Sequence, residues 1–179
     1  MAEVLPLSES ELRLLAALLR NRVRFMVVGL SAAALQGAPV VTEAVDLWFE
    51  DLGGPNLRKA LKDVGAAYVP AFGLNPPMLA GPGSEIFDVV ISMSGLRPFA
   101  DEAQNALEIE VGGLKLKILP LERILASKTA ADRPKDRLVI PVLRNVLRTV
   151  NVMRDKRAKS TPKRGSSRRN RRKSRTARK

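Results

Sequence analysis

Residues 27–37 read VVGLSAAALQG, and after a short gap residues 42–47 read TEAVDL. An apolar run that ends at Gly29 is typical of a buried strand leading into a tight turn, where glycine tolerates backbone angles that other residues avoid. The alanine-rich residues 31–35 predict a short helix, and residues 44–49 predict a second strand. A strand, a turn, a short helix and a second strand in close succession indicate an α/β fold.

The segments on either side extend this pattern. Ser8 and Glu11 form a capping box in front of leucines at helical spacing, which predicts a helix over about residues 9–22. The pair Gly112-Gly113 between two apolar segments predicts a β-hairpin. The other expected elements are helices at residues 57–64, 121–131 and 135–153 (the last kinked or split at Pro141), strands at 86–91, 107–111 and 114–118, and a loop rich in proline and glycine over 69–83.

The composition excludes several classes of chemistry. The chain has 179 residues, of which 45% are hydrophobic, enough for one domain with a buried core. It contains no histidine and no cysteine, so it cannot form a Ser–His–Asp triad, a Cys/His zinc site, a redox pair or a cysteine nucleophile. Any catalysis must therefore use carboxylates, lysines, arginines, hydroxyl groups and a hard cation such as Mg²⁺.

The positive charge is concentrated at the C-terminal end. Residues 154–179 hold 14 basic residues and one acid, whereas residues 1–153 hold 17 of each sign. We expect residues 1–153 to form the folded domain. Residues 154–179 are expected to be a disordered basic tail, because so few apolar side chains cannot offset the entropy of ordering. The densest basic cluster consists of Arg168, Arg169, Arg171, Arg172 and Lys173.

Two interpretations of this tail remain open. It is either a solvated polycation that improves solubility or an arm that holds RNA or DNA through its phosphates. Because the tail has no aromatic residue, base stacking is not available to it. Near the N-terminus, Glu3 and Arg13 argue against a signal peptide, and no apolar run reaches about 18 residues. We therefore expect a cytoplasmic protein that does not enter a membrane.

Three ordered motifs resemble those of the nucleotidyltransferase superfamily, the polymerase-β-like fold. The first spans residues 27–47, the second joins IFDVV at 86–90 to GLRPF at 95–99, and the third joins VGGLK at 111–115 to a closing segment at 119–136. The chain looks most like the minimal bacterial members related to toxin–antitoxin systems. This resemblance implies a mixed sheet flanked by helices. It also implies Mg²⁺-dependent transfer of a nucleoside monophosphate from an NTP to a hydroxyl group of RNA, protein or a small molecule.

The resemblance places two carboxylates at the active site. Asp46 matches the second acidic position of the family's Asp-x-Asp motif, and Asp88 matches a third carboxylate on a neighbouring strand. Residues at i and i+2 of a strand share one face, so such carboxylates can form an oxygen cage for Mg²⁺. These two residues are the candidate catalytic and metal-binding groups. Their structural alternatives are a strand-end carboxylate for Asp46 and a hydrogen-bonded edge residue for Asp88.

Four further residues are candidates for binding the nucleotide. Gly29 and Ser31 lie in the turn and short helix that would approach the phosphates, and Lys128 and Lys135 would neutralise triphosphate charge. A tight turn at Gly29 and a solvated Lys128 are the structural alternatives. We expect Asp136 to cap the last helix rather than to take part in chemistry.

The sequence departs from the family pattern at several positions. Ala44 occupies the first acidic position, where a methyl group cannot bind a metal. Glu43 is adjacent but would point to the opposite face of the strand. Leu30 replaces a glycine, Gln36 stands where many relatives have histidine, and Val40 stands where many have arginine. We therefore expect the transferase activity to be impaired or lost. The alternatives are a non-catalytic nucleic-acid-binding protein with the same fold, and a partner protein of the toxin–antitoxin type.

Overall fold

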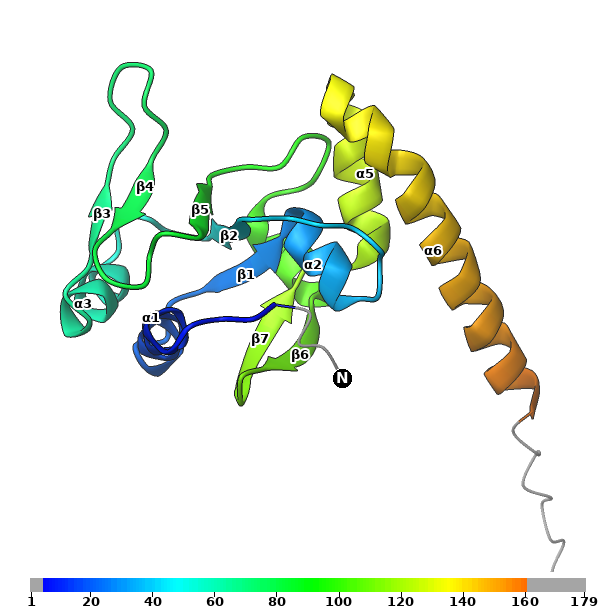
Figure 1. Ribbon diagram of the computed structural model, residues 1–179, viewed down its shortest axis with the longest axis horizontal. Helices are drawn as coiled ribbons and strands as arrows, with labels where there is room; N and C mark the ends of the chain where they lie inside the picture. The colour runs from blue at the N-terminus through cyan, green and yellow to red at the C-terminus, as the bar shows by residue number, and fades with distance from the viewer. Residues whose placement is uncertain (1–4, 161–179) are drawn as a thin grey trace, which may run out of the picture.

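The computed structural model describes the backbone of residues 5–160 and the side chains of residues 5–153. Figure 1 shows a twisted sheet with helices packed around it and a long C-terminal helix that leaves the body of the molecule. The helices are α1 (Glu9–Arg20), α2 (Gly29–Leu35), α3 (Pro55–Asp63), α4 (Phe99–Glu102), α5 (Leu121–Ala131) and α6 (Pro134–Ser160), with a 3₁₀ turn, η1, at Ala103–Asn105. The strands are β1 (Phe25–Val28), β2 (Val45–Phe49), β3 (Ala67–Val69), β4 (Met78–Ala80), β5 (Phe87–Val90), β6 (Leu107–Val111) and β7 (Leu114–Ile118).

The seven strands form one mixed sheet in the order β3-β4-β5-β2-β1-β7-β6. β1 pairs with β7 and β2 pairs with β5 in parallel, whereas the other neighbouring pairs are antiparallel. Because β1 and β2 run in opposite directions, the end of β1 lies beside the start of β2, where Val28 pairs with Asp46. The parallel register then places Asp46 opposite Asp88 of β5. This topology brings three segments together at one edge of the sheet.

Two groups of helices cover the sheet. α1 packs against α3, while α2 and α6 both pack against α5 (Figure 1). All four residues of β1 are buried, which is possible only because both faces of this central strand are covered. The core is aliphatic at its centre, and its fully buried large side chains include Leu14, Leu18, Met26, Leu47, Leu116, Ile118, Ile124 and Leu143. Burial of this apolar surface is the main force that holds the sheet and helices together.

Several local predictions are confirmed. Ser8 and Glu11 form the expected capping box at the start of α1, with both reciprocal hydrogen bonds present. Gly112 and Gly113 both have positive φ and join β6 to β7 in a tight hairpin. The mixed sheet flanked by helices also confirms the expected fold class.

Three local predictions need correction. Residues 69–83 are not a continuous loop, because β4 lies within them and pairs with β3 and β5. β3 and β4 have three residues each, too few to produce a recognisable alternation of apolar and polar residues. The short helix α4 was not expected. Pro141 does not split the last helix, and α6 continues through it as far as Ser160.

The charged cluster of the predicted tail, from Arg168 to Lys173, lies outside the described residues. Helix α6 continues beyond residue 153, where the change in charge suggested a boundary, so residues 154–160 have helical backbone. None of the helices in the described part of the chain is long and apolar enough to cross a bilayer.

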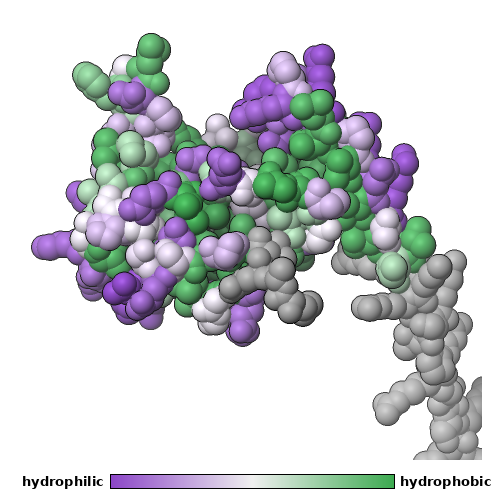
Figure 2. Space-filling view, viewed as in Figure 1, coloured by the Kyte–Doolittle hydropathy of each residue, from purple (hydrophilic) through white to green (hydrophobic). Residues whose placement is uncertain are grey.

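Apolar side chains gather on two projecting parts of the surface (Figure 2). At the tip of the β3–β4 hairpin, Phe72 is 83% exposed and Leu74 fully so. Along α6, Leu138, Val150 and Met153 are also exposed.

Candidate functional site

A cleft of about 580 Å³ lies at the sheet edge where β1, β2 and β5 meet. One wall consists of Gly29 and Leu30 at the start of α2, together with the carboxylates of β2 and β5. The facing wall comes from the end of α5 and the start of α6, which carry basic side chains. The cleft therefore places acidic and basic groups from distant parts of the sequence opposite each other.

The two predicted catalytic carboxylates lie side by side in this cleft. Asp46 and Asp88 occupy paired positions on adjacent parallel strands, so their side chains project from the same face of the sheet. Asp46 is half-buried and Asp88 is exposed. Neither carboxylate forms a hydrogen bond or an ion pair with a residue that the structure describes. Both oxygen pairs therefore face the cleft without a protein partner.

The electrostatic environment of Asp46 opposes its ionisation. Burial raises the pKa of Asp46, and the neighbouring Asp88 carboxylate raises it further. The positive charges of Lys128, Lys135 and Arg133 act in the opposite direction but do not cancel the effect. An ionised Asp46 is therefore a group that would gain from a bound cation.

Gly29 makes room for Asp46. Its φ of +65° lies in the left-handed region. A Cβ atom built at this position would come within 2.0 Å of Asp46 Oδ2. Glycine is therefore required twice at position 29, once for the backbone angle and once for the position of the carboxylate.

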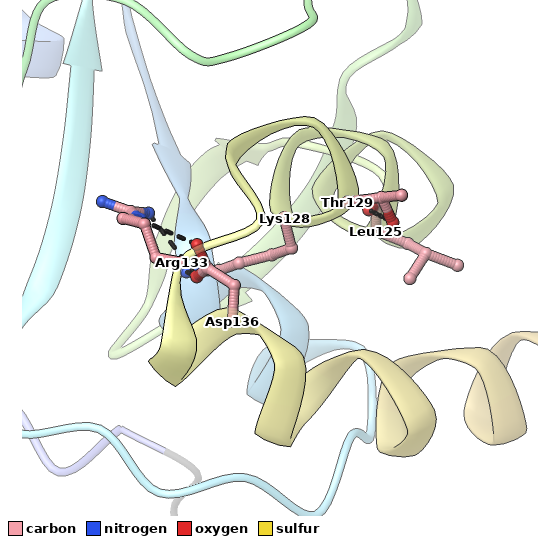
Figure 3. Close-up of polar contacts among 5 residues, drawn as sticks. All are labelled: Leu125, Lys128, Thr129, Arg133 and Asp136. Atoms are coloured by element: carbon pink, nitrogen blue, oxygen red, sulfur yellow. Dashed lines mark hydrogen bonds and ion pairs between the residues drawn. The ribbon is translucent and has the colours of Figure 1, made fainter.

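A buried ion cluster organises the basic wall (Figure 3). The Asp136 carboxylate is fully buried and accepts hydrogen bonds from Lys128 Nζ at 2.9 Å and Arg133 Nε at 2.7 Å. Burial by itself would raise the pKa of Asp136, but these two bonds outweigh it and hold the pKa below the ordinary value. Asp136 lies in the first turn of α6, but its carboxylate binds these two cations and no backbone N–H of a described residue, so the expected capping role is not seen.

The predicted nucleotide-binding residues do not all reach the cleft. Gly29, Lys128 and Lys135 line it, and Lys135 is exposed with no ion pair to any residue in the described part of the chain. Ser31 is fully buried, donates a hydrogen bond to the Val28 carbonyl at 3.0 Å, and does not line the cleft. Lys128 is mostly buried because it is paired with Asp136, so Lys135 is the more available cation.

Position 44 also lies in the cleft. Ala44 is among the lining residues together with Asp46, whereas Glu43 is exposed and is not. The Thr42 hydroxyl donates a hydrogen bond to the Ala44 carbonyl at 2.9 Å, which fixes the backbone just before β2. Among the described residues, the acidic side chains that line the cleft are Asp46, Asp88 and Asp136.

Sequence reasoning missed two contributors to the cleft and one residue that supports it. Arg133 lies in the closing segment at 119–136 but was not predicted as a site residue, although an arginine two positions before Lys135 was a usable signal. The segment Ser92–Ser94 after β5 also lines the cleft, and its sequence, Ser-Met-Ser, gives no recognisable pattern. Gln36 was noted only as a departure from the family pattern. Its side chain donates to the Leu119 carbonyl and accepts from the Leu121 N–H, so it joins α2 to the start of α5.

The available ligands suit one divalent cation rather than two. Among the described residues, no group of three or more acidic, histidine or cysteine side chains is close enough to hold a metal ion. Asp46 and Asp88 are oxygen donors of the kind that Mg²⁺ prefers, and two carboxylates with water molecules can satisfy its octahedral geometry. The donor set therefore fits a single hydrated Mg²⁺ or Mn²⁺.

Comparisons with known proteins identify the fold. The sequence matches no protein-family model and no curated protein. The structure is similar to the crystal structure of ANT(2″)-Ia in complex with adenylyl-2″-tobramycin, with a TM-score of 0.50, 15% identity, and coverage of 83% of this chain and 95% of that one. It is also similar to the solution structure of the antibiotic-resistance factor ANT(2″)-Ia, with a TM-score of 0.49, 13% identity, and coverage of 82% and 90%. A nucleotidyltransferase-like protein from Paracoccidioides brasiliensis has a TM-score of 0.43, 17% identity, and coverage of 87% and 94%.

ANT(2″)-Ia is an aminoglycoside nucleotidyltransferase, and this chain shares its fold. The expected nucleotidyltransferase-like fold is therefore confirmed.

Proposed function

We propose that the protein binds a nucleoside triphosphate with one divalent cation in the cleft, and that its capacity to transfer the nucleoside monophosphate is severely impaired. The observation that carries this proposal is the pair of carboxylates, Asp46 and Asp88, which face a basic wall across the cleft and have no hydrogen-bond or ion-pair partner among the described residues. Two adjacent carboxylates repel each other, and a cation between them removes that repulsion.

The residues would divide the work between cation and phosphate. Asp46 and Asp88 would hold the hydrated cation, which neutralises phosphate charge when it is bound. Lys135 is exposed, and Arg133, which pairs with Asp136, is exposed at the rim of the cleft. Both side chains can therefore reach phosphate oxygens. Lys128 adds positive potential while it remains bound to Asp136. Gly29 keeps the Asp46 carboxylate in position by leaving space beside it.

The impairment follows from the ligand count. The crystal structure of ANT(2″)-Ia contains adenylyl-2″-tobramycin, so that protein binds an adenylylated aminoglycoside. We carry over nucleotide binding in general and not the aminoglycoside. Phosphoryl transfer depends on positioning and on neutralising charge, commonly with two metal ions. With Ala44 in the cleft, Asp46 and Asp88 are the lining carboxylates that could hold a cation, because Asp136 is paired with Lys128 and Arg133, and a second cation would lack ligands among the described residues.

Calorimetric titration with a non-hydrolysable ATP analogue and Mn²⁺ tests the binding half of the proposal. Wild type should bind the analogue only when Mn²⁺ is present. In Asp46→Asn, adding Mn²⁺ should no longer improve binding of the analogue. Lys135→Gln should weaken binding about tenfold or more, as the loss of a charge-assisted contact does. Lys62→Gln is the matched control, because Lys62 is an exposed lysine on α3 that does not line the cleft. Equal affinity in all four proteins would show that the cleft does not bind the nucleotide.

The variant Ala44→Asp tests the catalytic half. Restoring a carboxylate that shares the cleft with Asp46 should strengthen Mn²⁺ binding. It should also increase self-labelling of the protein with α-labelled NTP by orders of magnitude. Strong labelling by wild type would contradict the proposed impairment. No gain in Ala44→Asp would indicate further defects, such as Leu30 at the turn, and would favour a protein that only binds.

A second function is supported by charge. Residues 154–179 carry a net charge of +13, which favours retention of RNA or DNA through phosphate contacts. The proposal that the same fold acts as a nucleic-acid-binding protein, or as a partner of the toxin–antitoxin type, is compatible with an impaired cleft. Deleting the charged end distinguishes it from nucleotide binding, since only nucleic-acid retention should change.

A further inference from the structure

A second cavity lies at the opposite end of β1 from the cleft. Its volume is about 340 Å³, within the range of small-molecule sites, which starts at about 300 Å³. Phe25, the first residue of β1, lines this cavity, whereas Val28, the last residue of β1, lines the cleft. The two sites share no lining residue, so nothing in the proposed nucleotide chemistry accounts for the second one.

The walls of this cavity are apolar and rigid. Leu19, Val23, Phe25, Phe99 and Ala103 contribute to it, and both phenylalanines are more than nine-tenths buried. Each phenylalanine is held by a second aromatic ring, with centroid separations of 5.6 Å and 5.9 Å. The Arg24 guanidinium also lies over the Phe99 ring, 5.8 Å from its centroid. The cavity therefore combines an apolar lining with an arginine that already contacts an aromatic ring.

The rim of the cavity is positively charged. Arg22, Arg24, Lys115 and Lys117 line it with a single acid, Glu108. Glu108 pairs with Lys115 at 3.6 Å, and Arg24 pairs with a glutamate outside the cavity at 2.8 Å. Arg22 and Lys117 form no ion pair with a residue that the structure describes. Two cations are therefore left to attract an anion to an apolar cavity.

Arg22 occupies a position that normally favours glycine. It follows the C-cap of α1 with a φ of +56°, and its N–H donates to the Leu19 carbonyl at 3.0 Å. Glycine is the usual residue at this point because a side chain is strained in the left-handed region. An arginine, rather than a glycine, therefore lines the cavity at this left-handed position.

We propose that this cavity binds a small organic anion with an aromatic body. The ring would lie against the apolar lining formed by Leu19, Val23 and Phe25, and its carboxylate, sulfonate or phosphate group would meet Arg22 and Lys117. The ligand combines the two features that the cavity offers, an apolar wall and a cationic rim. This inference does not depend on the proposed nucleotide function, because the residues are separate.

The test uses naphthalene-2-sulfonate as the probe and the full-length protein. Methyl NMR should show saturable shifts at Leu19, Val23 and Ala103. Uncharged 2-naphthylmethanol and inorganic sulfate should bind at least tenfold more weakly, because each lacks one of the two features. Equal binding of the uncharged compound, or shifts confined to methyl groups outside the cavity, would overturn the proposal.

Arg22→Gly should not destabilise the fold but should weaken binding of the probe, so it separates a folding defect from a binding defect. Relief of the left-handed strain should leave the Tm unchanged or higher, while loss of the guanidinium should weaken probe binding about three- to tenfold. Lys117→Gln should weaken binding similarly, and Lys62→Gln on α3 should have no effect. If Arg22→Gly and Lys117→Gln both bind the probe as tightly as wild type, the rim does not recognise an anion and the proposal is wrong.

Discussion

Replacing Gly29 by alanine should damage both the fold and the cleft, by an amount that the geometry allows us to calculate. An alanine at a φ of +65° costs about 1–2 kcal/mol, because Cβ approaches the following carbonyl oxygen. The new Cβ would also lie 2.0 Å from Asp46 Oδ2. Since the far end of that side chain can rotate away, the further cost is that of an unfavourable rotamer, about 0.5–1.5 kcal/mol. The free energy of unfolding should therefore fall by about 1.5–3.5 kcal/mol.

Gly37→Ala is the matched control. Gly37 follows the same helix, has a φ of +88°, and has open space where its Cβ would lie. It should lose only the backbone contribution, about 1–2 kcal/mol. Urea unfolding at 25 °C measures both losses, and a Mn²⁺ titration measures the second consequence, because only Gly29→Ala moves the Asp46 carboxylate.

A double variant separates the two contributions to the loss. In an Asp46→Ala background only the β-carbon remains near position 29, at 3.4 Å, which is close to an ordinary contact. Gly29→Ala should then cost no more than Gly37→Ala. Equal losses for Gly29→Ala and Gly37→Ala in the wild-type background, or unchanged Mn²⁺ affinity in Gly29→Ala, would refute the argument that position 29 holds the carboxylate in place.

Three other changes have expected outcomes. Asp46→Asn should raise the Tm at pH 7, because burial raises the pKa of Asp46 and its ionised form opposes folding. The gain should shrink as the pH falls toward the ordinary pKa of aspartate and be absent below it, and a gain that is independent of pH would contradict this cause. Asp136→Ala should destabilise the fold by about 2–4 kcal/mol in urea unfolding, since it leaves the mostly buried Lys128 without its carboxylate, and a loss below 1 kcal/mol would mean that water replaces the pair. Deleting residues 161–179, which contain ten basic residues and no acid, should abolish salt-dependent retention of RNA while nucleotide binding persists. Unchanged retention would place the nucleic-acid site in residues 1–160.

The elements that the sequence predicts best are those with a local cause. The capping box of α1 and the glycine pair of the β6–β7 hairpin depend on residues within a few positions of each other. The shared face of positions 44 and 46 follows from the period of a strand, and both line the cleft. By contrast, the pairing of Asp46 with Asp88 depends on β2 and β5 running in parallel, which only the family resemblance could suggest.

The parts that could not be predicted depend on contacts between distant segments. Lys128 and Lys135 looked equivalent in the sequence, yet a buried carboxylate from the start of α6 engages one and leaves the other exposed. Ser31 seemed suited to phosphate binding, but its side chain is buried and its hydroxyl donates to the Val28 carbonyl. The strands β3 and β4 are stabilised by pairing within the sheet, so no local pattern reveals them.

The position of Asp46 separates binding from catalysis in this molecule. Asp46 makes no hydrogen bond to a described residue, its ionisation opposes folding, and it requires a glycine with a left-handed backbone angle beside it. None of these features stabilises the fold by itself, and each is offset when a cation binds to the carboxylate, because a ligand that binds only the folded state stabilises that state by mass action. The same argument does not extend to position 44, where alanine causes no strain and offers no ligand. This difference between the two positions is the physical reason for our proposal that the cleft binds a cation while transfer is impaired.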